Sequence, residues 1–352
     1  MKKIACTTLV WFASACFSGA LADPLVDAEA ALQKRDVAAA IRILETASAE
    51  GNVAATGMLA SYLRNLPPPH GDVERACALA RRASDAADRM GAVTRAECLM
   101  SGSEKSDRPF EVARDLARKT LKSGFPTAGF TLYLAYSLDP QYSYPAGGGD
   151  RTKYNALAAL PISARGDQVE AFDGLADAIR AGHMGALQLA LAYFSESSAP
   201  GNIDRFVNLA ALLVRTGQSL PQSLVAPVRL AQKIKSTGTT HASVTAFNDA
   251  YQSALLGATL QMRSRGQPDK GCDAQGVKLI RVEAEPVQEP VYLPVTKQPF
   301  LSTYLVRGQW AETWTFAACQ ETVPVRMEFS ADGWGGARFQ TARQSLGSQP
   351  QP

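Results

Sequence analysis

Charge of either sign is not in excess in this sequence of 352 residues. Its 36 Lys and Arg residues nearly balance its 33 Asp and Glu residues, for a formal charge of +3. Two of the positive charges, Lys2 and Lys3, lie in the first 22 residues, and without them the charge is +1. A near-neutral chain has no strong attraction for nucleic acid or an anionic membrane surface. We therefore expect neither as a partner.

Catalytic and metal-binding motifs are also missing. The sequence has no Gly-x-Ser-x-Gly and no His-Glu-x-x-His, and the triple glycine at 147–149 lacks the continuation of a phosphate loop. It has no Cys-x-x-Cys, and His70, His183 and His241 complete no zinc-ligand spacing with the cysteines. Dispersed catalytic carboxylates would leave no sequence signature. The sequence therefore predicts no enzyme, no metal site and no cofactor.

Only the N-terminus has a long apolar run. Lys2 and Lys3 precede the run LVWFASACFSGA, and Ala20-Leu21-Ala22 forms a small-x-small cleavage site before Asp23. This order is typical of a secretory signal peptide, so we expect a periplasmic protein that begins at Asp23. The alternative is a membrane-anchored lipoprotein, with ASAC as the cleavage box and a lipid on Cys16. No other apolar run is long enough to predict a membrane span.

Four cysteines follow the predicted signal peptide, two in each half of the chain. Four cysteines allow three pairings, and an oxidising compartment favours disulfides. We expect Cys77 to pair with Cys98 and Cys272 to pair with Cys319, because pairing between the two regions needs contacts that the sequence does not suggest.

A helical block that ends at a glycine recurs along the first 265 residues. Glycine can adopt the left-handed conformation that closes a helix, and a second Ala-rich helix follows each block. An alanine stands at the fourth position after three of these glycines, where it allows close helix packing. Repeated helix pairs predict a mainly α fold, an α/α helical-repeat solenoid. The glycines are Gly51, Gly91, Gly124, Gly182 and Gly217, and the three alanines are Ala55, Ala128 and Ala186.

The loops between the helix pairs have cap residues after proline. In NLPPPHGDVER and SSAPGNIDRF we expect Asp72 and Asn202 to cap the next helix. His183 directly follows Gly182, and we expect it to make only local or solvent contacts.

The pattern resembles the Sel-one-like repeat, a relative of the tetratricopeptide repeat. The resemblance covers about residues 25 to 257, and it implies protein binding and scaffolding without catalytic residues. One whole unit follows the order Gly182, Ala186, Tyr193, Gly201, Ile203, Asp204, Ala210, Ala211 and Gly217. Part of another unit follows the order Gly51, Ala55, Tyr62, Gly71 and Val73.

Near Gly266 the composition changes, and short alternating runs predict a small antiparallel β domain. In QWAETWTFAAC the alternation places Trp310, Trp314 and Phe316 on one face together with Glu312. The segment resembles a small cystine-bearing module of exported proteobacterial proteins. The predicted organisation is a signal peptide over 1–22, helical repeats over 23–265, a β domain over 270–343 and a disordered tail over 344–352.

Several residues are candidates for contacts with a partner. The tyrosines lie in an insertion with proline and glycine, which suits either a contact loop or a linker. The tryptophans suit either the core of the sheet, the favoured interpretation, or an aromatic platform for a sugar. The arginines are expected on accessible faces of the first helix in each repeated helix pair. The candidates are Tyr142, Tyr144, Tyr154, Arg81, Arg82, Arg114, Trp310 and Trp314.

Together these observations predict a periplasmic scaffold or adaptor that binds protein partners in the cell envelope, for instance in exopolysaccharide assembly or export. One alternative is an immunity protein that neutralises a secreted toxin directed at the periplasm. Another is a carbohydrate-binding protein that uses the C-terminal aromatic module.

Overall fold

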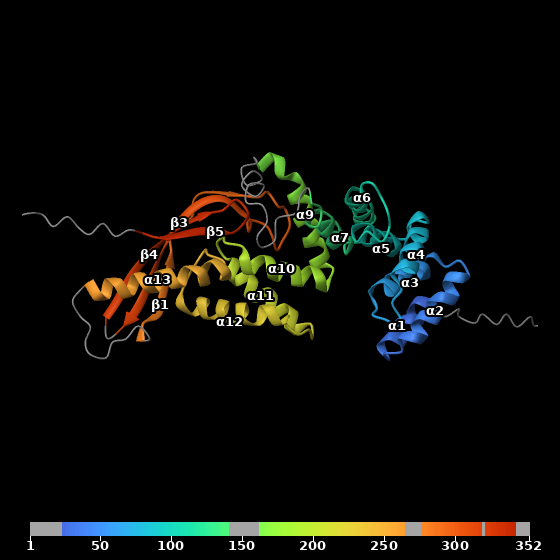
Figure 1. The fold of residues 1–352 in the computed structure, drawn as a ribbon, viewed down its shortest axis with the longest axis horizontal. Helices are drawn as coiled ribbons and strands as arrows, with labels where there is room; N and C mark the ends of the chain where they lie inside the picture. Colours follow the sequence, from blue (N-terminus) through green and yellow to red (C-terminus); the bar gives the residue numbers. More distant parts are fainter. Residues whose placement is uncertain (1–22, 141–161, 265–275, 319–320, 343–352) are drawn as a thin grey trace, which may run out of the picture. The chain divides into compact units, whose positions relative to one another are not determined.

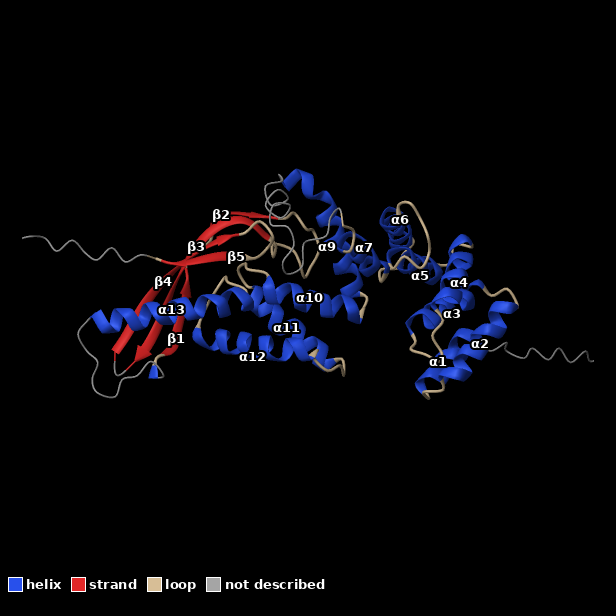
Figure 2. Ribbon diagram, in the orientation of Figure 1, coloured by secondary structure: helices blue, strands red, loops and turns tan. Residues whose placement is uncertain are grey.

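The computed structural model describes residues 23–140, 162–264, 276–318 and 321–342. It is mainly α-helical, with a small antiparallel sheet at the C-terminal end, as the sequence predicts (Figures 1 and 2). The chain divides into two compact units, residues 1–95 and 96–352. Each unit is described by itself.

The first unit is built from short helices that pack one after another. Asp36, Asn52 and Asp72 each accept a hydrogen bond from a backbone N–H in the first turn, so a side chain caps each of these helices. Leu44 and Leu59 fill the core between the helices. The helices are α1 (Pro24–Gln33), α2 (Val37–Ala49), α3 (Val53–Asn65), α4 (Val73–Asp85) and the start of α5 (Arg89–Met100).

Four of the five predicted glycine helix ends are confirmed. Gly51, Gly124, Gly182 and Gly217 have φ values of +91°, +83°, +79° and +79°. Gly91 is the exception, because it lies inside α5, and Ala87 takes the left-handed conformation after α4, with φ of +62°. Gly91 serves packing instead, since a Cβ there would lie 2.5 Å from the Cβ of Ala83.

The helices of the second unit show the same close packing. The predicted packing alanines Ala128 and Ala186 are both fully buried. Beside Ala128, Gly129 packs so tightly on the helix that contains Gly174 that a Cβ would lie 2.0 Å from the carbonyl oxygen of Gly174. The helices are α6 (Pro109–Lys122), α7 (Ala128–Ser137), the 3-10 helix η1 (Ile162–Arg165), α9 (Gly166–Arg180), α10 (Met184–Glu196), α11 (Asn202–Arg215), α12 (Gln222–Thr237) and α13 (Val244–Ser264).

The sheet is built around one long strand. Its order is β1-β3-β4-β5, and β2 pairs with the first part of β3 while β1 pairs with the second part. All pairs are antiparallel. The strands are β1 (Lys278–Ala284), β2 (Gln288–Tyr292), β3 (Leu305–Ala318), β4 (Glu321–Ala331) and β5 (Ala337–Thr341).

The sheet and helices α9–α13 share one hydrophobic core. The ring of Phe247 in α13 stacks on Trp314 of β3 with a centroid distance of 4.3 Å. Phe172 of α9 packs edge-on against Phe300, in the segment between β2 and β3, at 5.1 Å. The boundary that the sequence predicts near Gly266 lies outside the described residues. These shared aromatic contacts show that, within the second unit, the β segment is packed against the helices.

Polar contacts also join the helices to the sheet segment. Asn202 is 1% exposed, and its Nδ2 donates to the carbonyl oxygens of Ser197 and Thr303. The prediction that the Asn202 side chain caps α11 is wrong, because Gly201 is the N-cap residue and no side chain caps this helix. The amide of Asn202 instead satisfies buried carbonyl groups at the junction with the sheet segment.

Over the described parts of the chain, no helix has both the length and the apolar character that crossing a membrane requires.

Candidate ligand-binding groove

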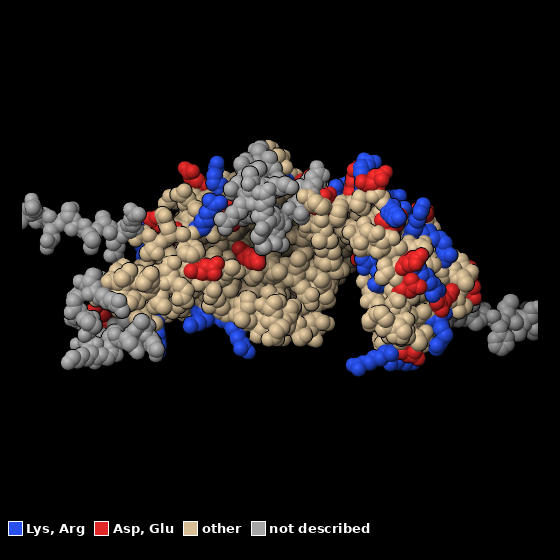
Figure 3. Space-filling model, viewed as in Figure 1, with Lys and Arg blue, Asp and Glu red and all other residues tan. Residues whose placement is uncertain are grey.

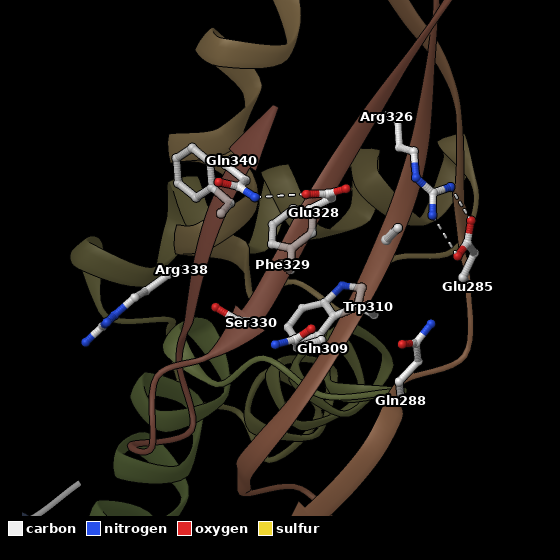
Figure 4. A pocket seen from close by; sticks show the side chains of 12 residues that line it. Glu285, Gln288, Gln309, Trp310, Arg326, Glu328, Phe329, Ser330, Arg338 and Gln340 are labelled. Atoms are coloured by element: carbon white, nitrogen blue, oxygen red, sulfur yellow. Dashed lines mark hydrogen bonds and ion pairs between the residues drawn. The ribbon is translucent and has the colours of Figure 1, made fainter. Parts of the chain in front are cut away.

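A groove of about 500 Å³ lies on the sheet and is lined by residues of β2, β3, β4 and β5 (Figure 4). This volume falls in the range of small-molecule sites, roughly 300–1,000 Å³. Ala311 of β3 is one of its lining residues. The others are Glu285, Gln288, Gln309, Trp310, Arg326, Glu328, Phe329, Ser330, Arg338, Phe339 and Gln340.

Strand alternation explains why the face of the sheet is hollowed there. Side chains of successive residues point to opposite faces, so Gln309, Ala311 and Thr313 share the face that bears the groove. Trp310 and Phe329 have side chains on the opposite face, where both are 3% exposed. A methyl group at position 311, beside the longer side chain of Glu328 on β4, leaves the space open.

The strand register sets polar side chains in one row across the sheet. Gln288 pairs with Gln309, Gln309 with Ser330, and Ser330 with Arg338. We call these four residues the polar row. Their side chains make no hydrogen bond or ion pair with other side chains or backbone in the described parts of the chain, so their hydrogen-bonding groups are open to a ligand.

The neighbouring charged residues are held by partners. Arg326 forms a two-point ion pair with Glu285, and its Nη2 lies 3.1 Å from Oε2 (Figure 4). The hydrogen bonds from Arg326 hold the pKa of Glu285 below its ordinary value. Gln340 donates from Nε2 to Oε2 of Glu328 at 2.8 Å. With Arg338 of the polar row, the two basic and two acidic residues give the groove no net charge.

Behind the groove, on the buried face of β3, lies Glu312. It is fully buried, and the indole Nε1 atoms of Trp310 and Trp314 each donate to one of its carboxylate oxygens at 2.9 Å. Every hydrogen-bond partner of this carboxylate is a donor, which suits an ionised group because it only accepts. We call Glu312 and its donors the Glu312 cluster.

The remaining donors of the Glu312 cluster come from the segment before α13. The hydroxyl of Thr240 lies 2.8 Å from both carboxylate oxygens, and the backbone N–H of His241 donates at 2.9 Å. The ring of His241 reaches the carbonyl oxygen of Glu285 through Nε2 at 3.1 Å. Burial lowers the pKa of His241, although the Glu312 carboxylate acts in the opposite direction. The cluster therefore fixes β3 to the helices.

The predicted aromatic platform is wrong for the two strand tryptophans. Trp310 is 3% exposed and Trp314 is fully buried, so neither offers a ring face to a sugar. The favoured interpretation, that they belong to the core of the sheet, is confirmed. The predicted face shared by Trp310, Glu312, Trp314 and Phe316 is also confirmed, since all four are buried.

The three candidate arginines differ. Arg81 and Arg82 are exposed, as predicted, and Arg82 also donates to the hydroxyl of Ser48 at 2.9 Å. Arg114 is only 8% exposed, so the prediction of an accessible face is wrong for it. Its guanidinium group is paired with Asp139, with Nη1 2.6 Å from Oδ2. A short ion pair with Asp139, which lies in the segment after α7, explains its burial.

Cys77 and Cys98 are disulfide-bonded. The second predicted pair, Cys272 and Cys319, lies outside the described residues. The same holds for the lipid-anchor candidate Cys16, the candidate cleavage site before Asp23 and the three tyrosines Tyr142, Tyr144 and Tyr154.

One local contact agrees with the sequence prediction, and one group was missed. His183 caps α10, accepting from the N–H of Ala186 through Nδ1 at 3.2 Å, which is a local contact as predicted. Its ring also lies 4.4 Å from the ring of Phe130 on α7, a contact distant in sequence that the sequence did not predict. The role of Glu312 was missed, although an acid in an alternating aromatic stripe is a usable signal for a buried polar cluster. The polar row carries no such signal, because its members belong to four strands.

No protein-family model matches this sequence, and no curated protein shows significant similarity to it. The described residues contain no group of three or more His, Cys, Asp or Glu side chains that could hold a metal ion.

Proposed function

We propose that this protein is an exported scaffold or adaptor of the bacterial cell envelope, without catalytic activity, that binds protein partners through its helical repeats. The resemblance to the Sel-one-like repeat supports a binding role, because repeats of this kind present a continuous surface to other proteins. The proposed setting is the assembly or export of an exopolysaccharide.

One observation carries the adaptor role. Helices α9–α13 and the sheet share a single core, so the second unit displays a helical surface and a sheet surface on one rigid body. An adaptor needs two such surfaces to hold two components together. The contact of Phe247 with Trp314 and the bonds of Asn202 to the sheet segment keep these surfaces in a fixed relation.

Export is supported by two independent features. The basic start and apolar run of the N-terminus are typical of a signal peptide. The disulfide state of Cys77 and Cys98 agrees with an oxidising compartment, since disulfides persist there and are rare in the cytosol.

Charge on the surface also suits protein partners. On the face shown in Figure 3, basic and acidic side chains are interspersed, without a large region of one sign. Exposed Arg81 and Arg82 on α4 lie among acidic side chains such as Glu74 and Asp85 of the same helix. Such mixed surfaces give specificity to protein contacts rather than attraction for a polyanion.

The test is site-specific photo-crosslinking in the native envelope. A photoreactive residue at Arg81 reports on the helical repeats, and one at Asp23 serves as a control at the predicted mature terminus. The proposal expects discrete protein adducts from Arg81 and from other exposed helix positions, in the periplasmic fraction. Export would be refuted by a cytosolic protein that keeps residues 1–22, and the adaptor role by the absence of protein adducts from every exposed helix position.

A further inference from the structure

The groove on the sheet suits an elongated ligand. Below the polar row, β3 carries only short side chains on this face, Ala311, Thr313 and Thr315. The neighbouring strand β4 carries longer ones in register, with Arg326 opposite Thr313 and Glu328 opposite Ala311. Of these residues Ala311, Arg326 and Glu328 line the groove, whose lining comes from β2, β3, β4 and β5, so the groove extends across the strands.

The polar row offers donors and acceptors together. Each glutamine amide has a carbonyl oxygen that accepts and an NH₂ group that donates, and the Ser330 hydroxyl does both. Arg338 adds a planar set of donors. A ligand that matches this set carries closely spaced groups that both donate and accept, which is the property of sugar hydroxyls.

Charge argues against ionic ligands. An anionic group in the groove would meet Glu328 as well as Arg338, and Arg326 is already paired with Glu285. A cationic group would meet the two arginines. Since the net charge of the lining is zero, a neutral ligand loses least on desolvation.

The apolar side chains of the lining argue against a peptide. Peptide and protein interfaces depend on aromatic or aliphatic anchors that enter pockets. The rings of Trp310 and Phe329 are buried on the opposite face, stacked on each other at 5.2 Å, and do not offer such pockets. Phe339 pairs with Phe329 and therefore lies on that face too, so Ala311 is the apolar lining residue on the face of the polar row.

We propose that this groove binds a neutral, hydroxyl-rich oligosaccharide chain. The polar row hydrogen-bonds the sugar hydroxyls, and the chain lies across the strands beside Ala311. The Glu312 cluster holds β3 from behind, so the groove is formed before the ligand arrives and loses little conformational entropy on binding. The proposal goes beyond the adaptor role and does not depend on a protein partner.

The test uses the purified mature chain and calorimetric titration with a panel of defined probes. The panel holds neutral hexasaccharides of glucose with different linkages and of N-acetylglucosamine, an anionic oligogalacturonate, and a neutral polar peptide. The proposal expects at least one neutral hexasaccharide to bind and the oligogalacturonate and peptide to bind at least tenfold more weakly.

Variants locate the binding site. Gln309→Ala combined with Arg338→Ala removes the centre and one end of the polar row and should weaken saccharide binding at least tenfold. Ala311→Leu keeps every polar group but fills the floor, and it should have a similar effect. Arg281→Ala removes an exposed arginine of β1 outside the groove lining and should leave affinity unchanged.

Three results would overturn the proposal. They are failure of every neutral hexasaccharide to bind, preference for the anionic probe or the peptide, and saccharide binding that survives both groove variants. The adaptor role is tested separately by protein adducts at helix positions, so failure of one proposal can be told from failure of the other.

Discussion

Replacement of Glu312 by Gln tests whether the Glu312 cluster joins the sheet to the helices. Oε1 accepts from Trp310 Nε1 and from the N–H of His241, while Oε2 accepts from Trp314 Nε1. Thr240 can turn its hydroxyl toward either oxygen. Gln keeps one oxygen and places an NH₂ group, itself a donor, where the other oxygen was. At least one indole N–H then loses its acceptor in a fully buried site.

The magnitude follows from the bonds that are lost. A hydrogen bond to a charged acceptor contributes about 1.5–3 kcal/mol, and a buried donor left unpaired costs about 1–3 kcal/mol. Removal of a buried charge recovers part of the desolvation free energy, which works in the opposite direction. We expect Glu312→Gln to lower the free energy of unfolding of the second unit by about 3 kcal/mol.

Urea unfolding followed by tryptophan fluorescence measures this change. After the predicted signal peptide, the tryptophans of the chain are Trp310, Trp314 and Trp334, so the emission reports on the second unit. Glu283→Gln is the matched control, because Glu283 is exposed and forms its ion pair with Arg281 on the same strand. The control should shift the free energy of unfolding by less than about 0.5 kcal/mol. A loss below about 1 kcal/mol for Glu312→Gln, or a gain, would refute the reasoning.

Two further predictions concern packing and pH. Gly129→Ala places a Cβ 2.0 Å from the Gly174 carbonyl oxygen and should lower the free energy of unfolding, measured by heat or urea, by about 3 kcal/mol. The control Gly166→Ala, with no atom within 4 Å of its Cβ, should be neutral or stabilising. Equal effects of the two changes would contradict the close contact. Burial lowers the pKa of His241 in the folded state below the ordinary histidine value of about 6.5. Just below about pH 6.5 the unfolded chain therefore binds more protons at this histidine than the folded chain does. The free energy of unfolding should fall as the pH drops through this range. His241→Gln should reduce this loss in urea titrations between neutral and mildly acidic pH, without abolishing it, because burial also lowers the pKa of His183; an unchanged pH slope would count against the assignment.

Local physical chemistry made most helix ends and strand faces predictable. Gly51 and Gly124 were recognisable because a helix end needs a left-handed residue, which glycine adopts without a steric penalty. Gly91 misled for the same reason, since glycine also serves close helix packing, and only the packing shows which of the two roles applies. The local rule does not identify Ala87, a residue that seldom adopts positive φ.

The burial of charged side chains was predictable only in part. Arg114 stands in an amphipathic helix where an exposed position is the ordinary expectation for arginine. Its burial depends on Asp139, which lies in the segment after α7 and reaches it through tertiary packing. A sequence cannot show that the two charges meet, because helix periodicity relates only residues a few positions apart.

Taken alone, the sequence determined the helical character of the first part of the chain, the β character of the last part, the two faces of β3 and the place of Glu312 among aromatic residues, because helical and period-two patterns are local properties. Tertiary structure decided which residues from other elements lie against each face of β3. Thr240 reaches Glu312 across 72 positions of sequence, and the polar row exists only because strand register aligns Gln288, Gln309, Ser330 and Arg338. Register and helix docking are set by the free energy of the whole core, which residues distant in sequence share, so no short window of sequence contains them.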